Sequence, residues 1–307
     1  MVVLKCPVAS PLLSGLTIAK QEFGVATHLA EVFGYQPVDG ILGLGWPALA
    51  VDKVTPPMQN LLSTLDQPLF TVWMDRKLTI SNGGNAGLIT YGAIDTKNCQ
   101  SQVNYVPLSA ETYWQFPIQG FTIGSFSETT KQQVISDTGT SWIGAPSTVV
   151  NGVVKQTGAK YDATNELYTV ACTTQKTQPD LVFTINGVTY NVPSVEYVLD
   201  LGLGNGKQTG AKYDATNELY TVACTTQKTQ PDLVFTINGV TYNVPSVEYV
   251  LDLGLGNGKC ALTFFSMDAG GFGPAWILGD TWIRTYCNIY DIGQKRIGFA
   301  KANHSGI

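Results

Sequence analysis

The stretch "VISDTGTSW", Val134 to Trp142, is the most informative segment of this sequence. A lone Asp-Thr-Gly triplet is weak evidence, because such residues fill turns in many proteins. Here the triplet follows the apolar residues of a β-prone run, which places Asp137 at the end of a strand. A carboxyl group presented in this way is a candidate for acid–base catalysis.

The composition indicates a globular protein. The chain has 307 residues, of which 44% are hydrophobic and only 13% are charged, and this balance excludes a disordered chain. The formal net charge of −5 argues against nucleic acid as a partner, since nucleic-acid binding needs a basic face. No segment reaches the roughly 18 uninterrupted apolar residues of a membrane helix. We therefore expect neither a nucleic-acid partner nor a membrane partner.

The local pattern predicts mostly β structure. Short runs rich in Val, Ile, Thr, Phe and Tyr are separated by Gly, Asn and Pro, and they lie at 67–81, 87–95, 121–126, 131–137 and 181–193. Asn186-Gly187 predicts a hairpin, because a type I′ turn needs positive φ at both central residues. Helices are expected only at Pro56–Leu65 and after Pro146. The predicted fold class is all-β with a few short helices.

One segment of 52 residues is present twice without a single difference, as Lys155–Gly206 and Lys207–Gly258. Repeat architectures usually contain three or more diverged units. We interpret the two copies as a very recent tandem duplication or a defect in the assembled gene. A sheet has room for one copy of the "LVFTINGVTYNVP" hairpin. Because the second copy leads directly to Cys260, we expect its hairpin, Leu233–Pro245, to occupy the sheet.

Several motifs accompany the Asp-Thr-Gly stretch. They are "DGILGLGW" at Asp39–Trp46, "GLITYGAID" at Gly87–Asp95 and "WILGD" at Trp276–Asp280. Together they resemble the pepsin-like aspartic proteases, the family of pepsin and cathepsin D. The segment Gly270–Asp291 and the closing "KRIGFAKA" are similar to the nematode members. The resemblance extends from about Phe23 to Ala302 apart from one 52-residue copy.

The resemblance implies a pepsin-like, two-lobed acid protease fold with an incomplete first lobe. On this basis residues 1–95 are a remnant of the N-terminal lobe, 96–125 an inter-lobe region and 126–307 the C-terminal lobe, which contains both copies of the duplicated segment.

The resemblance also implies roles for individual residues. Asp137 is the expected catalytic carboxylate, and Thr138, Gly139, Thr140 and Ser141 complete the active-site loop. Thr138 is expected to bond to the other lobe's loop. Gly139 allows close approach of backbone and substrate, and Thr140 hydrogen-bonds the carboxylate and helps to keep it ionised. Two apolar-apolar-Gly strands are expected to support the loops, and they are Ile41, Leu42 and Gly43 in the first lobe and Ile277, Leu278 and Gly279 in the second.

The second aspartate of such a pair is not among the 307 residues, because no other Asp is followed by Thr-Gly. Asp137 precedes Gly279 by 142 residues, or by 90 when one 52-residue copy is left out. A first lobe built alike places the partner about 47 positions before Met1. We therefore expect an aspartic-type endopeptidase whose sequence is truncated, which also lacks the substrate-covering flap, and which is inactive as written.

Two other hypotheses about the function stay open. The chain could be a catalytically dead homologue that binds peptides or proteins, or a homodimer that pairs two Asp137 loops. The dimer is the weaker of these, because the first-lobe remnant occupies space that a partner needs. The expected partner is a polypeptide substrate in extended conformation, and the expected state is a monomer without cofactor or metal.

The six cysteines are widely spaced and form no C-x-x-C pair, which fits disulfides better than a zinc site. By resemblance, Cys224 pairs with Cys260 and Cys99 with Cys287, and Cys6 and Cys172 remain unassigned. The family is secreted or lysosomal, although the start of this chain is not typical of a signal peptide. His28 and His304 are expected to be ordinary surface residues. Asn303-His304-Ser305 matches the acceptor motif for N-linked glycosylation, but such a match arises by chance at least as often.

Overall fold

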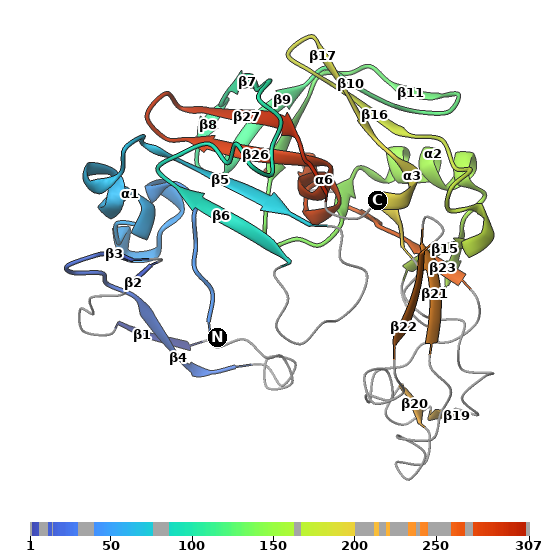
Figure 1. Ribbon diagram of the computed structural model, residues 1–307, viewed down its shortest axis with the longest axis horizontal. Helices are drawn as coiled ribbons and strands as arrows, with labels where there is room; N and C mark the ends of the chain where they lie inside the picture. Colours follow the sequence, from blue (N-terminus) through green and yellow to red (C-terminus); the bar gives the residue numbers. More distant parts are fainter. Residues whose placement is uncertain are drawn as a thin grey trace.

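A computed structural model describes residues 2–5, 12–13, 15–29, 40–75, 86–162, 167–199, 212–214, 219–221, 233–237, 240–244, 259–267 and 273–304. The described part is mostly β with a few short helices, as the sequence predicted (Figure 1). Within these ranges, no helix is both long enough and apolar enough to cross a membrane.

A six-stranded sheet carries the Asp-Thr-Gly stretch. Its order is β24-β13-β25-β12-β9-β8, and its bounds are Phe264–Ser266, Ile143–Ala145, Trp276–Leu278, Gln132–Ser136, Trp114–Ile118 and Ala110–Glu111. The pairing of β12 with β25 is parallel, whereas β12 pairs with β9 in the antiparallel sense. Strand β9 alternates buried and half-buried residues, which shows that one of its faces is packed against the core.

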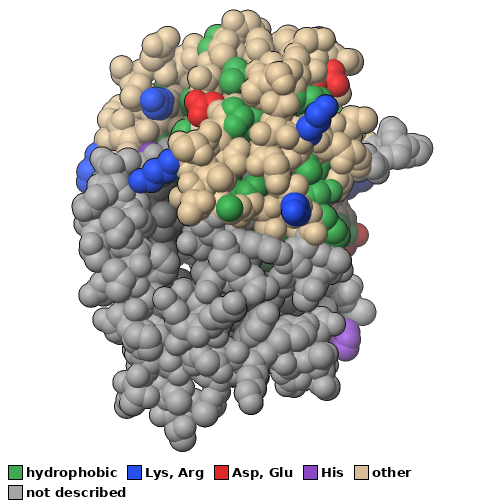
Figure 2. Space-filling model, turned by 90° about the vertical axis from the view of Figure 1, so that its right-hand side faces the viewer, with side chains coloured by type: hydrophobic (Ala, Val, Ile, Leu, Met, Phe, Trp, Pro, Cys, Tyr) green, Lys and Arg blue, Asp and Glu red, His purple; other side chains and the backbone are tan. Residues whose placement is uncertain are grey.

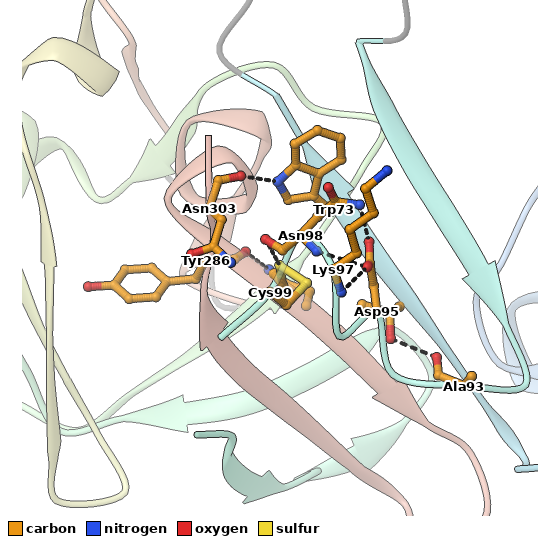
Figure 3. Close-up of a disulfide and its surroundings, with 11 residues drawn as sticks. Trp73, Ala93, Asp95, Lys97, Asn98, Cys99, Tyr286 and Asn303 are labelled. Atoms are coloured by element: carbon orange, nitrogen blue, oxygen red, sulfur yellow. Dashed lines mark hydrogen bonds between the residues drawn. A yellow bond between two sulfur atoms is a disulfide. The ribbon is translucent and has the colours of Figure 1, made fainter. Parts of the chain in front are cut away.

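A five-stranded sheet joins distant parts of the chain. Its order is β6-β5-β26-β27-β7, with bounds Gly87–Tyr91, Leu69–Met74, Tyr286–Asp291, Arg296–Lys301 and Asn104–Pro107. Figure 1 shows the red C-terminal strands lying beside the blue and green strands. The Cys99–Cys287 disulfide that the resemblance implied is formed next to this sheet, with a Cα–Cα separation of 6.0 Å (Figure 3). It links two segments 188 residues apart.

The helices are short. The two expected helices are present as α1 (Pro57–Leu61), followed by the 3₁₀ turn η4 (Leu62–Thr64), and as α2 (Ser147–Thr157). Gly158 ends α2 in the left-handed region with φ 68°, a conformation that glycine adopts without steric cost. The sequence did not indicate α3 (Ser194–Tyr197), α6 (Asp280–Thr285) or the 3₁₀ turns η2 (Pro47–Leu49) and η3 (Val51–Lys53), because segments of three to six residues show no helical period.

The hydrophobic core contains a group of fully buried aromatic rings. Trp276 packs against Phe121 and Phe183 with ring centroids 5.1 and 5.8 Å apart, and Trp282 of α6 packs against Phe183 at 5.3 Å. All four side chains are fully buried. Burial of large rings contributes about 2–3 kcal/mol each to folding, so this group fixes the six-stranded sheet against its neighbour.

That neighbour is a four-stranded sheet that contains the hairpin of the first copy. Its order is β11-β10-β16-β17, with bounds Phe126–Glu128, Gly120–Ile123, Leu181–Ile185 and Val188–Val192. The turn between β16 and β17 has φ 50° at Asn186 and φ 77° at Gly187, as a type I′ hairpin requires. A second four-stranded sheet has the order β14-β15-β23-β18, with bounds Lys160–Asp162, Leu167–Ala171, Lys259–Leu262 and Val198–Leu199.

The second copy forms the same hairpin but does not enter the sheet. Its strands β21 (Leu233–Ile237) and β22 (Val240–Val244) pair in a register identical to that of β16 and β17, and together they make a two-stranded sheet. The strands β19 (Lys212–Asp214) and β20 (Leu219–Thr221) make another, as do β1 (Val2–Lys5) with β4 (Gly24–His28) and β2 (Leu12–Leu13) with β3 (Leu16–Thr17).

The expectation that Leu233–Pro245 occupies the sheet is therefore wrong. The first copy has the advantage because α2 runs through its first three residues, and the chain then continues directly into β14. A short connection to a helix that is already packed costs less closure entropy than a connection that passes the whole first copy.

The segment after the second copy also pairs with the first copy. Strand β23 lies between β15 and β18, and Cys260 is opposite Val170 in the ladder. The second copy is thus inserted between two neighbouring strands, β18 and β23. Cys224, the expected partner of Cys260, lies outside the described residues, and so does Cys6.

The two copies provide a matched pair of variants. Phe183→Ala removes a fully buried ring from the core, so we expect it to lower the free energy of unfolding by about 3–5 kcal/mol. Phe235→Ala makes the same change at the equivalent position of the second copy, and we expect a loss of less than about 1 kcal/mol. Urea denaturation of both variants measures the difference. Equal losses would mean that the copies exchange places and would contradict this assignment.

Candidate active site

The Asp-Thr-Gly loop begins where the parallel pair β12 and β25 ends. Ser136 is opposite Leu278 in the ladder, and the backbone NH of Asp137 donates to the Leu278 carbonyl at 3.1 Å. The last three residues of β12 are buried, whereas Asp137 is half-buried and Thr138 and Gly139 are exposed. The end of the strands β12 and β25 therefore places Asp137 near the surface of the described structure.

The Asp137 carboxyl is held by a donor on each oxygen. The backbone NH of Gly139 donates to Oδ1 at 2.9 Å, and the Thr140 hydroxyl donates to Oδ2 at 2.6 Å. The Thr140 bond is the one that the resemblance implied. Hydrogen bonds to a charged acceptor are among the stronger ones in proteins, so these two contacts fix the rotation of the carboxyl plane. For Thr138, no described residue supplies the second loop to which it was expected to bond.

The strand motif Ile277-Leu278-Gly279 lies directly under this loop. A Cβ atom on Gly279 would lie 1.9 Å from the Thr140 carbonyl oxygen and 2.5 Å from that of Trp142, so only glycine fits. The next residue, Asp280, donates its backbone NH to the Thr140 carbonyl at 2.9 Å. The Thr281 hydroxyl donates to the Ser141 carbonyl at 3.3 Å. These contacts join the Asp-Thr-Gly loop to the end of β25 and the start of α6.

The matching motif Ile41-Leu42-Gly43 is not in a strand, contrary to expectation. Ile41 is 89% exposed and Leu42 is 49% exposed. No atom lies within 4 Å of a Cβ built on Gly43. A strand needs a hydrogen-bonding partner, and no strand in the described part of the chain pairs with this segment. The apolar-apolar-Gly pattern alone was therefore not sufficient to form the supporting element.

A buried polar group supports Asp137 from inside the protein. The Ser136 hydroxyl donates to Asn288 Oδ1 at 2.8 Å and lies 2.9 Å from the Tyr290 hydroxyl. Burial raises the pKa of Tyr290, so its hydroxyl stays neutral and available as a donor. The sequence analysis missed Asn288 and Tyr290. The signal that could have found Asn288 is a polar amide inside the apolar strand β26.

Asp280 is a second carboxyl group beside the loop that the sequence analysis did not assign. Burial raises its pKa to about 6, Arg284 opposes this shift and the charge of Asp137 adds to it. Its Oδ1 is buried and has no hydrogen-bond partner among the described residues. Glu196, which is 2% exposed, lies 3.4 Å from Arg284, so the guanidinium is shared between two acids.

Other expected surface or packing residues can be placed. Trp276 is a core residue, and His28 is exposed, as the sequence analysis expected of His28. His304 is not a surface residue, because its side chain is 6% exposed and its Nδ1 lies 3.5 Å from Asp75. It is buried because the segment after β27 folds back, so that the Trp73 indole donates to the Asn303 carbonyl (Figure 3).

The described residues of the site support acid–base chemistry. Within the described ranges, no group of three His, Cys, Asp or Glu is placed to hold a metal ion. On the face shown in Figure 2, Lys and Arg side chains of the described part lie singly among uncharged ones. The chemistry that the described residues support is proton transfer by a half-buried, oriented carboxylate.

Comparison with known proteins identifies relatives of the whole chain. The family model "Eukaryotic aspartyl protease" matches residues 12–208 and 204–302, so each copy of the duplicated segment falls in a separate match. "Aspartic protease 1" of Caenorhabditis elegans is 57% identical over 95% of this chain and 61% of its own length. "Aspartic protease 17" of the same organism is 51% identical with the same coverage, and human "Gastricsin" is 28% identical over 94% of this chain and 61% of its own length. The chain thus spans about three fifths of these relatives.

The two Ile-Leu-Gly motifs provide a matched test of the loop contact. We expect Gly279→Ala to lower the free energy of unfolding by about 3 kcal/mol, because a methyl group cannot fit against the Thr140 carbonyl without moving the backbone. Gly43→Ala is the control, since its Cβ has open space. Chemical denaturation of both variants distinguishes them. Equal stability of the two variants would show that the loop does not rest on Gly279.

The raised pKa of Asp280 predicts that the stability of the protein depends on pH. Its folded pKa of about 6 lies above the ordinary value of 3.8, so the folded state favours the protonated form. The contribution of Asp280 is therefore fully present below about pH 4 and is lost as the pH rises through about 6. We expect Asp280→Asn to raise the melting temperature at pH 7.5 and to change it little at pH 3.5.

The control for this prediction is Asp66→Asn, which alters an exposed carboxyl group between η4 and β5, outside the loop. We expect that variant to shift the melting temperature by a small and equal amount at both pH values. An Asp280→Asn variant that is destabilised at pH 7.5 would contradict the prediction.

Proposed function

The chain belongs to the eukaryotic aspartyl protease family, and on this premise we propose that Asp137 is one of the two carboxylates of an aspartic-type endopeptidase. The observation that carries the proposal is the geometry of the Asp137 carboxyl, which has a donor on each oxygen and lies at the exposed end of a parallel strand pair. A structural aspartate in a turn needs neither this exposure nor the glycine contact beneath it.

The proposed reaction is hydrolysis of a peptide bond by water. Two carboxyl groups within hydrogen-bonding distance cannot both ionise cheaply, so they share one proton over an acidic pH range. The ionised group accepts a proton from the bound water, and the protonated group polarises the peptide carbonyl. Asp137 supplies one of these groups, and Gly139 and Thr140 orient it.

The second carboxyl group must come from another Asp-Thr-Gly loop, because the 307 residues contain only one. Asp280 does not fill this role in the proposal, since it is followed by Thr-Trp rather than by Thr-Gly and its Oδ1 is buried. We infer that the chain as given does not cleave peptides. The five-stranded sheet takes strands from each of the proposed parts 1–95, 96–125 and 126–307.

We propose a polypeptide in extended conformation as the substrate and no cofactor. The Cys99–Cys287 disulfide supports an oxidising compartment, in line with a secreted or lysosomal protein. The competing function is peptide or protein binding without catalysis. It is favoured by the exposure of Thr138 and Gly139, since no described residue belongs to a second Asp-Thr-Gly loop that would cover them.

An activity assay separates the two functions. The 307-residue chain should show no cleavage of denatured haemoglobin or casein at acidic pH. Fusing to this chain the part of C. elegans aspartic protease 1 that lies N-terminal to the matched region should give acid protease activity when that part contains an Asp-Thr-Gly loop. Asp137→Asn in the fusion should lower that activity by about 10³-fold or more, because the isosteric amide cannot accept the proton.

The control for the fusion is Asp180→Asn, which changes an exposed aspartate outside the loop and should leave the activity unchanged. A folded fusion without activity would favour the binding function. Pepstatin-sensitive cleavage by the unfused chain that disappears in Asp137→Asn would instead show that two Asp137 loops pair in a dimer.

A further inference from the structure

The acceptor motif Asn303-His304-Ser305 is the one Asn-x-Ser/Thr sequence in the chain, and the proposed function does not use it. From its surroundings we infer that Asn303 carries an N-linked glycan. The inference rests on the exposure of Asn303, on its attachment to the disulfide segment and on the open pocket beside it. It does not depend on catalysis by Asp137.

The structure places Asn303 at the surface although its neighbours are buried. Asn303 is exposed, whereas Ala302 and the side chain of His304 are each 6% exposed. The backbone of Asn303 is held on both sides, since its NH donates to the Asn98 carbonyl at 2.7 Å and its carbonyl accepts from the Trp73 indole at 3.0 Å. Asn303 is therefore an exposed residue on a fixed backbone, and Figure 3 shows the bond from Trp73 to its carbonyl. Ser305 lies outside the described residues and enters by its place in the sequence.

The disulfide supplies an independent argument about the compartment. Asn98, which accepts the bond from Asn303, directly precedes Cys99, and Cys99 also forms a β-bridge with Ala302. Cys99 and Cys287 are 2% and 0% exposed, so their disulfide is part of the core and is made as the protein folds. Proteins acquire such disulfides in the secretory pathway, which is also where N-linked glycans are added.

The pocket beside Asn303 has room for the attached sugar. Its volume is about 630 Å³, and besides Asn303 its lining includes Pro193, Tyr286 and Lys301. The Tyr286 hydroxyl donates to the Asn191 carbonyl, which fixes the ring at the pocket wall. A pyranose ring can pack on such a wall, while its hydroxyl groups meet the polar side chains at the rim.

The modification is a group transfer from a lipid-linked diphosphate oligosaccharide. The side-chain amide nitrogen of Asn303 forms a bond to the anomeric carbon of the sugar and loses one proton. The bond between that carbon and the diphosphate oxygen breaks, and the lipid diphosphate leaves with the bonding electron pair. Because the folded structure uses both backbone groups of Asn303 and buries His304, the transfer precedes the docking of this segment.

The test is expression of the full chain behind a cleavable secretion signal in insect cells, followed by treatment with peptide N-glycosidase. We expect the glycosidase to lower the apparent mass of both cell-associated and secreted protein, and to convert Asn303 into aspartate in the peptide mass spectrum. Asn303→Gln and Ser305→Ala should each abolish the shift, and Ser305→Thr should keep it.

Asn191→Gln is the matched control, because Asn191 is exposed at the same pocket but is followed by Val-Pro and forms no acceptor motif. That variant should retain the full shift. The proposal is overturned if the glycosidase leaves the wild-type chain unchanged. It is also overturned if the shift persists in Asn303→Gln and Ser305→Ala, because the glycan would then be elsewhere. Ser305→Ala keeps Asn303 itself, so a folding defect of Asn303→Gln does not obscure the result.

Discussion

The contact between Gly279 and the loop after Asp137 is the constraint on which the described site depends. A parallel strand pair gives slanted hydrogen bonds and needs distant segments, so β12 and β25 come together only when the chain between them has folded. Their pairing brings the Thr140 carbonyl to where any side chain on residue 279 would be. The same pairing sets the Asp137 NH on the Leu278 carbonyl, and the position of the carboxyl group follows from it. The chemistry of Asp137 is thus determined by the backbone of a strand more than a hundred residues away.

Much of this arrangement could be predicted from the sequence, because the signals are local and each has a physical cause. The Asn186-Gly187 turn is formed as predicted, since two consecutive positive φ values leave few alternatives. The helix after Pro146 ends at a glycine for the same kind of reason. The Thr140 bond to Asp137 spans three residues and needs little more than the loop itself. Cys99 and Cys287 were paired by resemblance alone, because connectivity is not encoded locally.

What could not be predicted depends on partners far away in the chain. Ile41-Leu42-Gly43 and Ile277-Leu278-Gly279 are the same motif, yet among the described residues a strand pairs only with the second. The choice between the two copies was predicted wrongly, because identical residues carry no preference and the helix before the first copy decided the outcome. The burial of His304 follows from the packing of Trp73 against the chain end, and no pattern around His304 indicates it. Asp280 gains its raised pKa from burial, which a sequence does not display.

The docking position beside β10 recognises a hairpin by its shape and side chains, and it has no means of recognising the molecule to which the hairpin belongs. Each molecule carries one hairpin in that position and another of the same sequence outside it. Whenever the first hairpin detaches, a neighbour's spare hairpin is an equally good replacement, and the neighbour's own position stays available to a third molecule. Such an exchange is head-to-tail and does not close into a symmetric dimer. We therefore expect the duplication to favour open-ended, domain-swapped assembly at high protein concentration.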